Sequence, residues 1–131
     1  MQQGPGWRFG LDPSRVGFPV LLGGEGWAVE LTAEEARGLQ EAVMRLVAEW
    51  GAIADQLMAE ESITLELERG PIWVELEGTA RAVALRFVLQ PEAGGRGVEG
   101  SWPIEASQAL VAVWAQDPWA GGGSPTAAPQ G

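Results

Sequence analysis

The alternation of apolar and polar side chains over residues 62–89 constrains the fold more than any other feature of this sequence. The segments SITLELE, IWVELE and RAVALRFVL have the two-residue period of half-buried β-strands. The short sequences RGP and GTA, which separate these segments, are typical of turns. We therefore expect three consecutive antiparallel strands, with one face buried and the other exposed.

A single choice of register places the aliphatic side chains of all three strands on one face. In this register Leu67 lies opposite Ile72, and Leu76 lies opposite Val83. Register is strongly specified when one face of a sheet is buried, because a slip of one residue would turn the aliphatic side chains outward. We expect a helix to cover this aliphatic face.

The other face of these strands is expected to be acidic and exposed. It carries Thr64, Glu66, Glu68, Trp73, Glu75, Glu77, Ala82, Ala84 and Arg86. The expected register places Trp73 opposite Glu66 and Arg86, with Glu75 diagonal to Arg86. Arg86 can therefore either pair with Glu75 or stack on Trp73.

A long amphipathic helix is expected before these strands. Thr32 and Glu35 have the spacing of a capping box, which satisfies backbone N–H groups at a helix start. The apolar residues that follow at intervals of three and four are Ala36, Leu39, Val43, Leu46, Trp50, Ile53 and Leu57. Such a stripe fits a coiled coil or a helix lying across a sheet, and the strands expected on both sides favour the sheet. The same stripe is compatible with a homodimer.

Shorter elements complete the expected domain. Strands are predicted at residues 7–11, 20–22 and 27–31, with DPS and GGEG as turn sequences. The segment GVEGSW is predicted to be a short strand before a second, shorter helix. Pro103 suits the first turn of that helix, with Ser101 or Trp102 near its cap. The residues expected on its buried side are Ile104, Ser107, Leu110, Val111 and Trp114.

The predicted fold class is α+β, with an antiparallel sheet on which one long and one short helix pack. A single domain is expected at residues 7–117, preceded by an extension at residues 1–6. Residues 118–131 are rich in Gly and Pro and are expected to form a disordered tail.

The composition excludes several classes of chemistry. The 131 residues include no Cys, His or Lys, and all eight basic residues are Arg. The chain therefore has no Ser-His-Asp triad, no thiolate nucleophile, no Schiff-base lysine and no ordinary zinc or iron site. The remaining catalytic hypothesis is carboxylate chemistry, either with Mg²⁺ or Mn²⁺ or as acid and base. Because the acidic face is expected to be open, we predict no enzyme activity and no cofactor.

The formal net charge of −10 disfavours both nucleic acid and anionic membranes as partners. Nucleic-acid binding would require the scattered arginines to converge, namely Arg8, Arg15, Arg81, Arg86 and Arg96. No apolar run approaches the roughly 20 residues of a membrane span, and no signal peptide is recognisable. We therefore expect a soluble cytoplasmic protein.

Gly95, Gly97 and Gly100 have the G-x-G-x-x-G spacing of a dinucleotide-binding loop. That loop must be followed directly by a helix, and here Trp102 and Pro103 intervene. We therefore interpret this segment as a turn between antiparallel strands.

Seven tryptophans are many for a chain of this length, and tryptophan is enriched at protein interfaces. Trp27 and Trp50 fit core positions, whereas Trp73 is expected to be partly exposed beside glutamates. The candidate residues for binding a partner are Trp73, Glu75, Arg86, Glu66, Glu77 and Trp102. The function predicted from these residues is a non-catalytic module that binds an unidentified protein.

Several segments resemble the cyanobacterial and chloroplast-lineage family called domain of unknown function 1818. These segments are WRFGLDPSR, FPVLLGGEGWAVELT, IWVELEG, LRFVL and GVEGSWP, and the resemblance covers residues 7–114. It implies a small soluble protein of photosynthetic bacteria with no assigned activity or site residues. It also implies a fold similar to positive cofactor four and the Whirly proteins, in which strands followed by a helix occur twice. Because those proteins regulate transcription and bind single-stranded DNA, the alternative function is single-stranded DNA or RNA binding.

Overall fold

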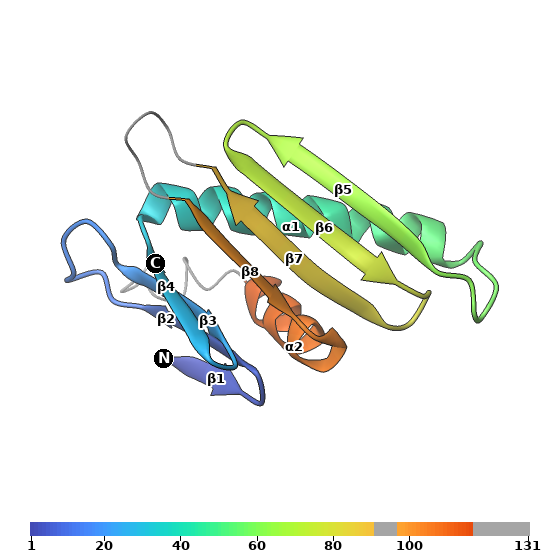
Figure 1. Ribbon diagram of the computed structural model, residues 1–131, viewed down its shortest axis with the longest axis horizontal. Coiled ribbons are helices and arrows are strands. Elements are labelled where there is room, and N and C mark those ends of the chain that lie inside the picture. Colours follow the sequence, from blue (N-terminus) through green and yellow to red (C-terminus); the bar gives the residue numbers. More distant parts are fainter. Residues whose placement is uncertain (91–96, 117–131) are drawn as a thin grey trace, which may run out of the picture.

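The computed structural model of this chain describes residues 1–90 and 97–116. Within these residues, four strands followed by one helix occur twice along the chain (Figure 1). The first unit comprises β1 (Gln2–Gly4), β2 (Trp7–Leu11), β3 (Val20–Gly24), β4 (Trp27–Leu31) and α1 (Ala33–Ala54). The second unit comprises β5 (Ile63–Arg69), β6 (Ile72–Gly78), β7 (Val83–Leu89), β8 (Val98–Trp102) and α2 (Ile104–Trp114).

The eight strands form two antiparallel sheets, sheet A in the order β1-β2-β3-β4 and sheet B in the order β5-β6-β7-β8. The α+β class and the antiparallel pairing are confirmed, but the strands divide between two sheets where we expected one. The segment at residues 1–6, expected as an extension, contains β1, which pairs with β2. The expected tail at residues 118–131 lies outside the described residues.

Aromatic side chains join the two sheets. Trp27 of β4 packs against Phe87 and Trp102 of sheet B, with ring centroids 6.3 and 5.2 Å apart. The Trp102 indole N–H donates a hydrogen bond of 2.9 Å to the carbonyl oxygen of Gly23 in β3. Gly100 of β8 makes room for this contact, because a Cβ there would lie 2.3 Å from the Trp27 ring. Side-chain packing, rather than a continuous ladder, therefore holds the sheets together.

The long helix begins and packs as its sequence predicts. The Thr32 hydroxyl accepts from the Glu35 backbone N–H at 3.0 Å, and the Glu35 carboxylate accepts from the Thr32 N–H at 2.9 Å. The buried residues of α1 are Ala36, Leu39, Ala42, Val43, Leu46 and Trp50. The stripe ends earlier than expected, since Ile53 is half-buried and Leu57 lies beyond the last helical residue. α1 packs on β5 and β6, as expected for a helix lying across a sheet.

The faces of sheet B are as expected, but the register of both hairpins differs from our prediction by two residues. Leu67 pairs with Val74 instead of Ile72, and Leu76 pairs with Leu85 instead of Val83. A shift of two residues keeps each side chain on its face, because strand side chains alternate with a period of two.

The connections between the strands explain this difference in register. The first turn contains only Gly70 and Pro71, and Gly70 has a φ of +58°, a conformation that favours glycine. The second connection contains residues 79–82, where the Thr79 N–H donates to the Ala82 carbonyl at 2.9 Å. We expected turns at 69–71 and 78–80. The centre of each observed connection lies one residue later in the chain than in the expected register, and this displacement shifts the pairing by two residues.

The short helix begins at Ile104, with Pro103 as its N-cap rather than in its first turn. Its buried residues are Ala106, Ser107, Leu110 and Trp114. Ile104, which we expected to be buried, is 40 % exposed because the buried stripe follows Ala106, Leu110 and Trp114. α2 packs on β7 of sheet B and on β2 of sheet A. Neither helix in the described part of the chain has the length and hydropathy to span a membrane.

The Ser107 hydroxyl of α2 is inserted between β7 and β8. It accepts a hydrogen bond from the Leu85 N–H and donates one to the Trp102 carbonyl, each at 2.9 Å. Leu85 and Trp102 are paired residues of the two strands, and Ser107 is only 2 % exposed. This buried hydroxyl therefore satisfies two backbone groups at the end of the ladder.

Replacing Ser107 with Ala is expected to lower the free energy of unfolding by about 1–3 kcal/mol, because both backbone groups would lose their partner in a buried place. Chemical denaturation monitored by circular dichroism measures this change. Ser101→Ala removes an exposed hydroxyl from β8 and is expected to change the stability by less than about 0.5 kcal/mol. Equal stabilities of the two variants would show that the Ser107 bridge does not contribute.

Candidate functional site

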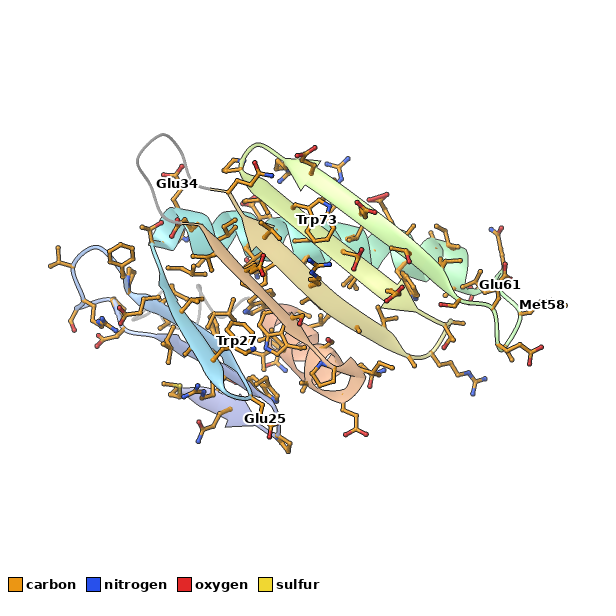
Figure 2. All side chains as sticks on the ribbon, in the orientation of Figure 1. Glu25, Trp27, Glu34, Met58, Glu61 and Trp73 are labelled. Carbon is orange, nitrogen blue, oxygen red and sulfur yellow. The ribbon has the colours of Figure 1, made fainter. Side chains whose placement is uncertain are left out.

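The face of sheet B that points away from α1 and α2 is the candidate surface, and we call it the outer face. Figure 2 shows Trp73 on the near side of the sheet, with α1 behind it. Ala82, which we expected on this face, lies in the loop between β6 and β7. The outer face comprises Thr64, Glu66, Glu68, Trp73, Glu75, Glu77, Ala84, Arg86, Val88, Glu99 and Ser101.

Among these residues, five glutamates accompany a single arginine, so the outer face is strongly acidic. Glu66 lies directly opposite Glu75, and like charges in this position destabilise a sheet by about 0.2–1 kcal/mol. On the neighbouring strand β7, Arg86 is paired directly with Glu75, rather than diagonal to it as expected. One arginine therefore faces the most crowded pair of carboxylates.

Two polar neighbours hold the Trp73 side chain on the outer face. Its indole N–H donates to a carboxylate oxygen of Glu66 at 3.0 Å. The Arg86 guanidinium carbon lies 5.3 Å from the Trp73 ring centroid, so Arg86 stacks on the ring. In the observed register Trp73 is opposite Glu68 and Val88, and it reaches Glu66 and Arg86 along the diagonals. Trp73 is half-buried.

A shallow pocket of about 170 Å³ adjoins the outer face at β8. It is lined by Trp27, Arg86, Glu99, Gly100 and Ser101. Trp27 is half-buried rather than fully inside the core, and it brings an aromatic ring to the side of sheet B that also carries Glu99. The pocket therefore combines an aromatic wall with one carboxylate and one guanidinium.

Trp102, which we included among the partner-binding residues, does not share this face. It is 2 % exposed, and its ring stacks on Phe87 with the centroids 5.5 Å apart. Its partner in the ladder is Leu85, which places it on the side of the helices. The structure instead brings Glu66, Trp73, Glu75, Glu77 and Arg86 together on the outer face.

Three residues of the outer face, Val88, Glu99 and Ser101, were missing from our sequence-based set. The strand GVEGSW was expected, but its two faces were not assigned. The alternation along this strand could have predicted its outer residues, because Glu99 and Ser101 have the parity opposite to that of Trp102.

The arginines of the described residues occupy different parts of the fold. Arg8 donates to the Trp27 carbonyl oxygen at 3.2 Å, and Arg15 forms an ion pair with Glu30. Arg81 lies in the loop between β6 and β7, and Arg86 lies within β7. The fifth candidate, Arg96, lies outside the described residues. The four that the structure describes do not line one common groove.

The glycine-rich segment does not have the context of a phosphate-binding loop. Gly100 lies within β8 and pairs with Phe87, and the strand continues to Trp102 before a helix begins. Gly95 lies outside the described residues. Over residues 1–90 and 97–116, the structure contains no group of three acidic side chains arranged to hold a metal ion.

Two four-stranded antiparallel sheets and two helices define this chain as an α+β protein with an acidic outer face on sheet B. The chain belongs to the family described as Domain of unknown function (DUF1818), whose model matches residues 2–116. This confirms the resemblance seen in the sequence.

A crystal structure of a protein of unknown function from Prochlorococcus sp. NATL2A, described as a DUF155 family member, is similar to this chain. The two chains are 40 % identical, with a TM-score of 0.84. The match covers 91 % of this chain and 98 % of the other. The comparison with curated proteins finds no match.

Proposed function

We propose that this protein is a non-catalytic interaction module that binds a basic segment of a partner protein on the outer face of sheet B. The proposal rests on the position of Trp73, a large aromatic residue that is half-buried on a face rich in glutamates and hydrogen-bonded to Glu66. Tryptophan contributes strongly to binding energy where it becomes fully covered by a partner. The surrounding carboxylates provide the charge complementarity that selects a cationic partner.

The placement of charges also supports a cationic partner. Glu66 and Glu75 face each other directly, which costs stability in the free protein. A lysine or arginine placed above this pair would interact favourably with both carboxylates. The proposed partner therefore relieves a repulsion that the isolated chain must tolerate.

The edge of sheet B offers a way to position such a segment. β5 is the last strand of the sheet, and among the described residues it pairs only with β6. Exposed glutamates alternate along β5 with the half-buried Ile63, Leu65 and Leu67. An extended segment that alternates basic and apolar residues matches both faces of this edge. A second copy pairing edge to edge would instead bring Glu66 and Glu68 close to the same residues of its partner.

Titration with two synthetic peptides tests this function. One peptide alternates arginine and valine, and the other alternates glutamate and valine. We expect saturable binding of the basic peptide by calorimetry, with affinity that decreases as salt is added, and no binding of the acidic peptide. Equal binding of both peptides, or of neither, would contradict the proposal.

A labelled single-stranded oligonucleotide tests the alternative function. The repeated order of four strands and a helix is compatible with a fold similar to positive cofactor four and the Whirly proteins, and that similarity stays a prediction. Because phosphate binding requires clustered cations, we expect no change in fluorescence anisotropy on addition of protein at low salt. Oligonucleotide binding without binding of the basic peptide would favour the nucleic-acid alternative.

A further inference from the structure

A cavity of about 320 Å³ lies between α1 and α2 on the helical side of sheet B. α1 covers β5 and β6 while α2 covers β7, and Figure 1 shows both helices behind the sheet. Leu76 and Val83 of the sheet line the cavity between the two helices. Ala80 and Arg81, from the loop between β6 and β7, line it at the end of the sheet.

The walls of this cavity are apolar, and the polar side chains of α2 that line it already have partners. The Ser107 hydroxyl bridges the two strands above it. The Gln108 amide donates to the Arg81 backbone carbonyl at 3.0 Å. Arg81 is the single charged residue among the described residues that line the cavity, and its side chain is exposed. The cavity therefore combines an apolar interior with one cation.

We propose that this cavity binds a small amphipathic carboxylate, with its apolar chain between the helices and its carboxylate on Arg81. Pockets of about 300 Å³ or more that are largely apolar, with a few polar groups, are typical sites for small ligands. At about 30 Å³ for each water-sized group, the cavity holds on the order of ten non-hydrogen atoms. A saturated fatty acid of medium chain length has this size, and its carboxylate matches the planar guanidinium of arginine.

Gly51 of α1 provides a direct test, because it lines the cavity and has free space around it. A Cβ added at Gly51 would meet no atom within 4 Å. Gly51→Leu therefore adds a large apolar side chain at the wall of the cavity without a clash at its first atom. Gly51→Ala adds only a methyl group and is the matched control. Both substitutions replace glycine inside a helix, which reduces the conformational freedom of the unfolded chain and favours the helix.

The probe is octanoate, titrated into the whole protein by calorimetry and followed by the intrinsic fluorescence of tryptophan, since Trp50 lines the cavity. We expect saturable binding to the unmodified protein and to Gly51→Ala, with affinity at least tenfold lower for Gly51→Leu. Thermal melting is expected to show both variants folded and at least as stable as the unmodified protein.

Arg81→Gln tests the chemistry of the ligand. We expect this substitution to weaken octanoate binding several-fold and to leave the binding of octanol unchanged, because only the carboxylate interacts with the cation. Absence of saturable octanoate binding to the unmodified protein at millimolar concentration would overturn the proposal. Equal affinity of folded Gly51→Leu and Gly51→Ala would also overturn it. The outer face lies on the opposite side of sheet B. Failure of octanoate binding would therefore not change the interpretation of the peptide experiment.

Discussion

Replacing Trp102 with Ala is expected to lower the free energy of unfolding by about 3–5 kcal/mol, a loss typical of a buried tryptophan truncated to alanine. Trp102 stacks on Phe87, packs against Trp27 and donates to the Gly23 carbonyl oxygen. These contacts connect sheet B to two strands of sheet A. The substitution therefore removes both core packing and the principal side-chain connection between the sheets.

Trp73→Ala is the matched control for this prediction, because it removes the same side chain from the opposite face of sheet B. Trp73 is half-buried, donates to Glu66 and stacks with Arg86, so its loss is expected to cost about 1 kcal/mol. Trp102→Phe keeps a ring and removes the indole N–H, and an intermediate loss is expected. Chemical denaturation of the three variants measures these differences. Similar losses for Trp73→Ala and Trp102→Ala would contradict the assignment of the two faces.

Replacing Glu66, Glu75 and Glu77 together with Gln is expected to weaken binding of the arginine–valine peptide by about ten- to a hundred-fold. Each lost charge pair on a surface contributes up to about 1 kcal/mol, and a tenfold change in affinity corresponds to about 1.4 kcal/mol. Glutamine keeps the size of the side chain and can still accept the hydrogen bond from the Trp73 indole. Calorimetric titration measures the affinity, and the dependence on salt is expected to decrease in the same variant.

The control replaces Glu41, Glu49 and Glu60 with Gln, which removes three charges from exposed positions outside sheet B. The formal net charge changes from −10 to −7 in both variants. We expect the control to bind the peptide with nearly unchanged affinity, because distant exposed charges are screened by salt. If both variants lose affinity equally, the peptide responds to overall charge and the outer face is not its binding site.

Local patterns in the sequence determined which elements form and which face of each element is buried. The capping box at Thr32 and Glu35 fixes the start of α1 through contacts within four residues. The alternation along β5, β6 and β7 determines which side chains face the helices, because this depends only on parity. The acidic outer face with Trp73 could therefore be predicted before any pairing was known.

The exact neighbours on the outer face depended on the connections between strands. Moving the centre of the turn by one residue, to lie between Gly70 and Pro71, shifts the ladder by two residues without changing either face. Hydrophobic pattern alone does not distinguish these registers, since both bury the same residues. As a result, the contacts of Trp73 with Glu66 and Arg86 occur along diagonals rather than directly across the strands.

Only the tertiary structure decided how the two sheets meet and where Trp102 lies. The strand GVEGSW is short, and its glycine makes its burial ambiguous in the sequence. Gly100 acquires its role only when the Trp27 ring, far away in the chain, occupies the space beside it. The cavity between α1 and α2 likewise depends on the packing of distant elements, since no local pattern specifies a space between them. Period and capping are local properties of a chain, whereas register, sheet docking and cavities arise from contacts between distant residues.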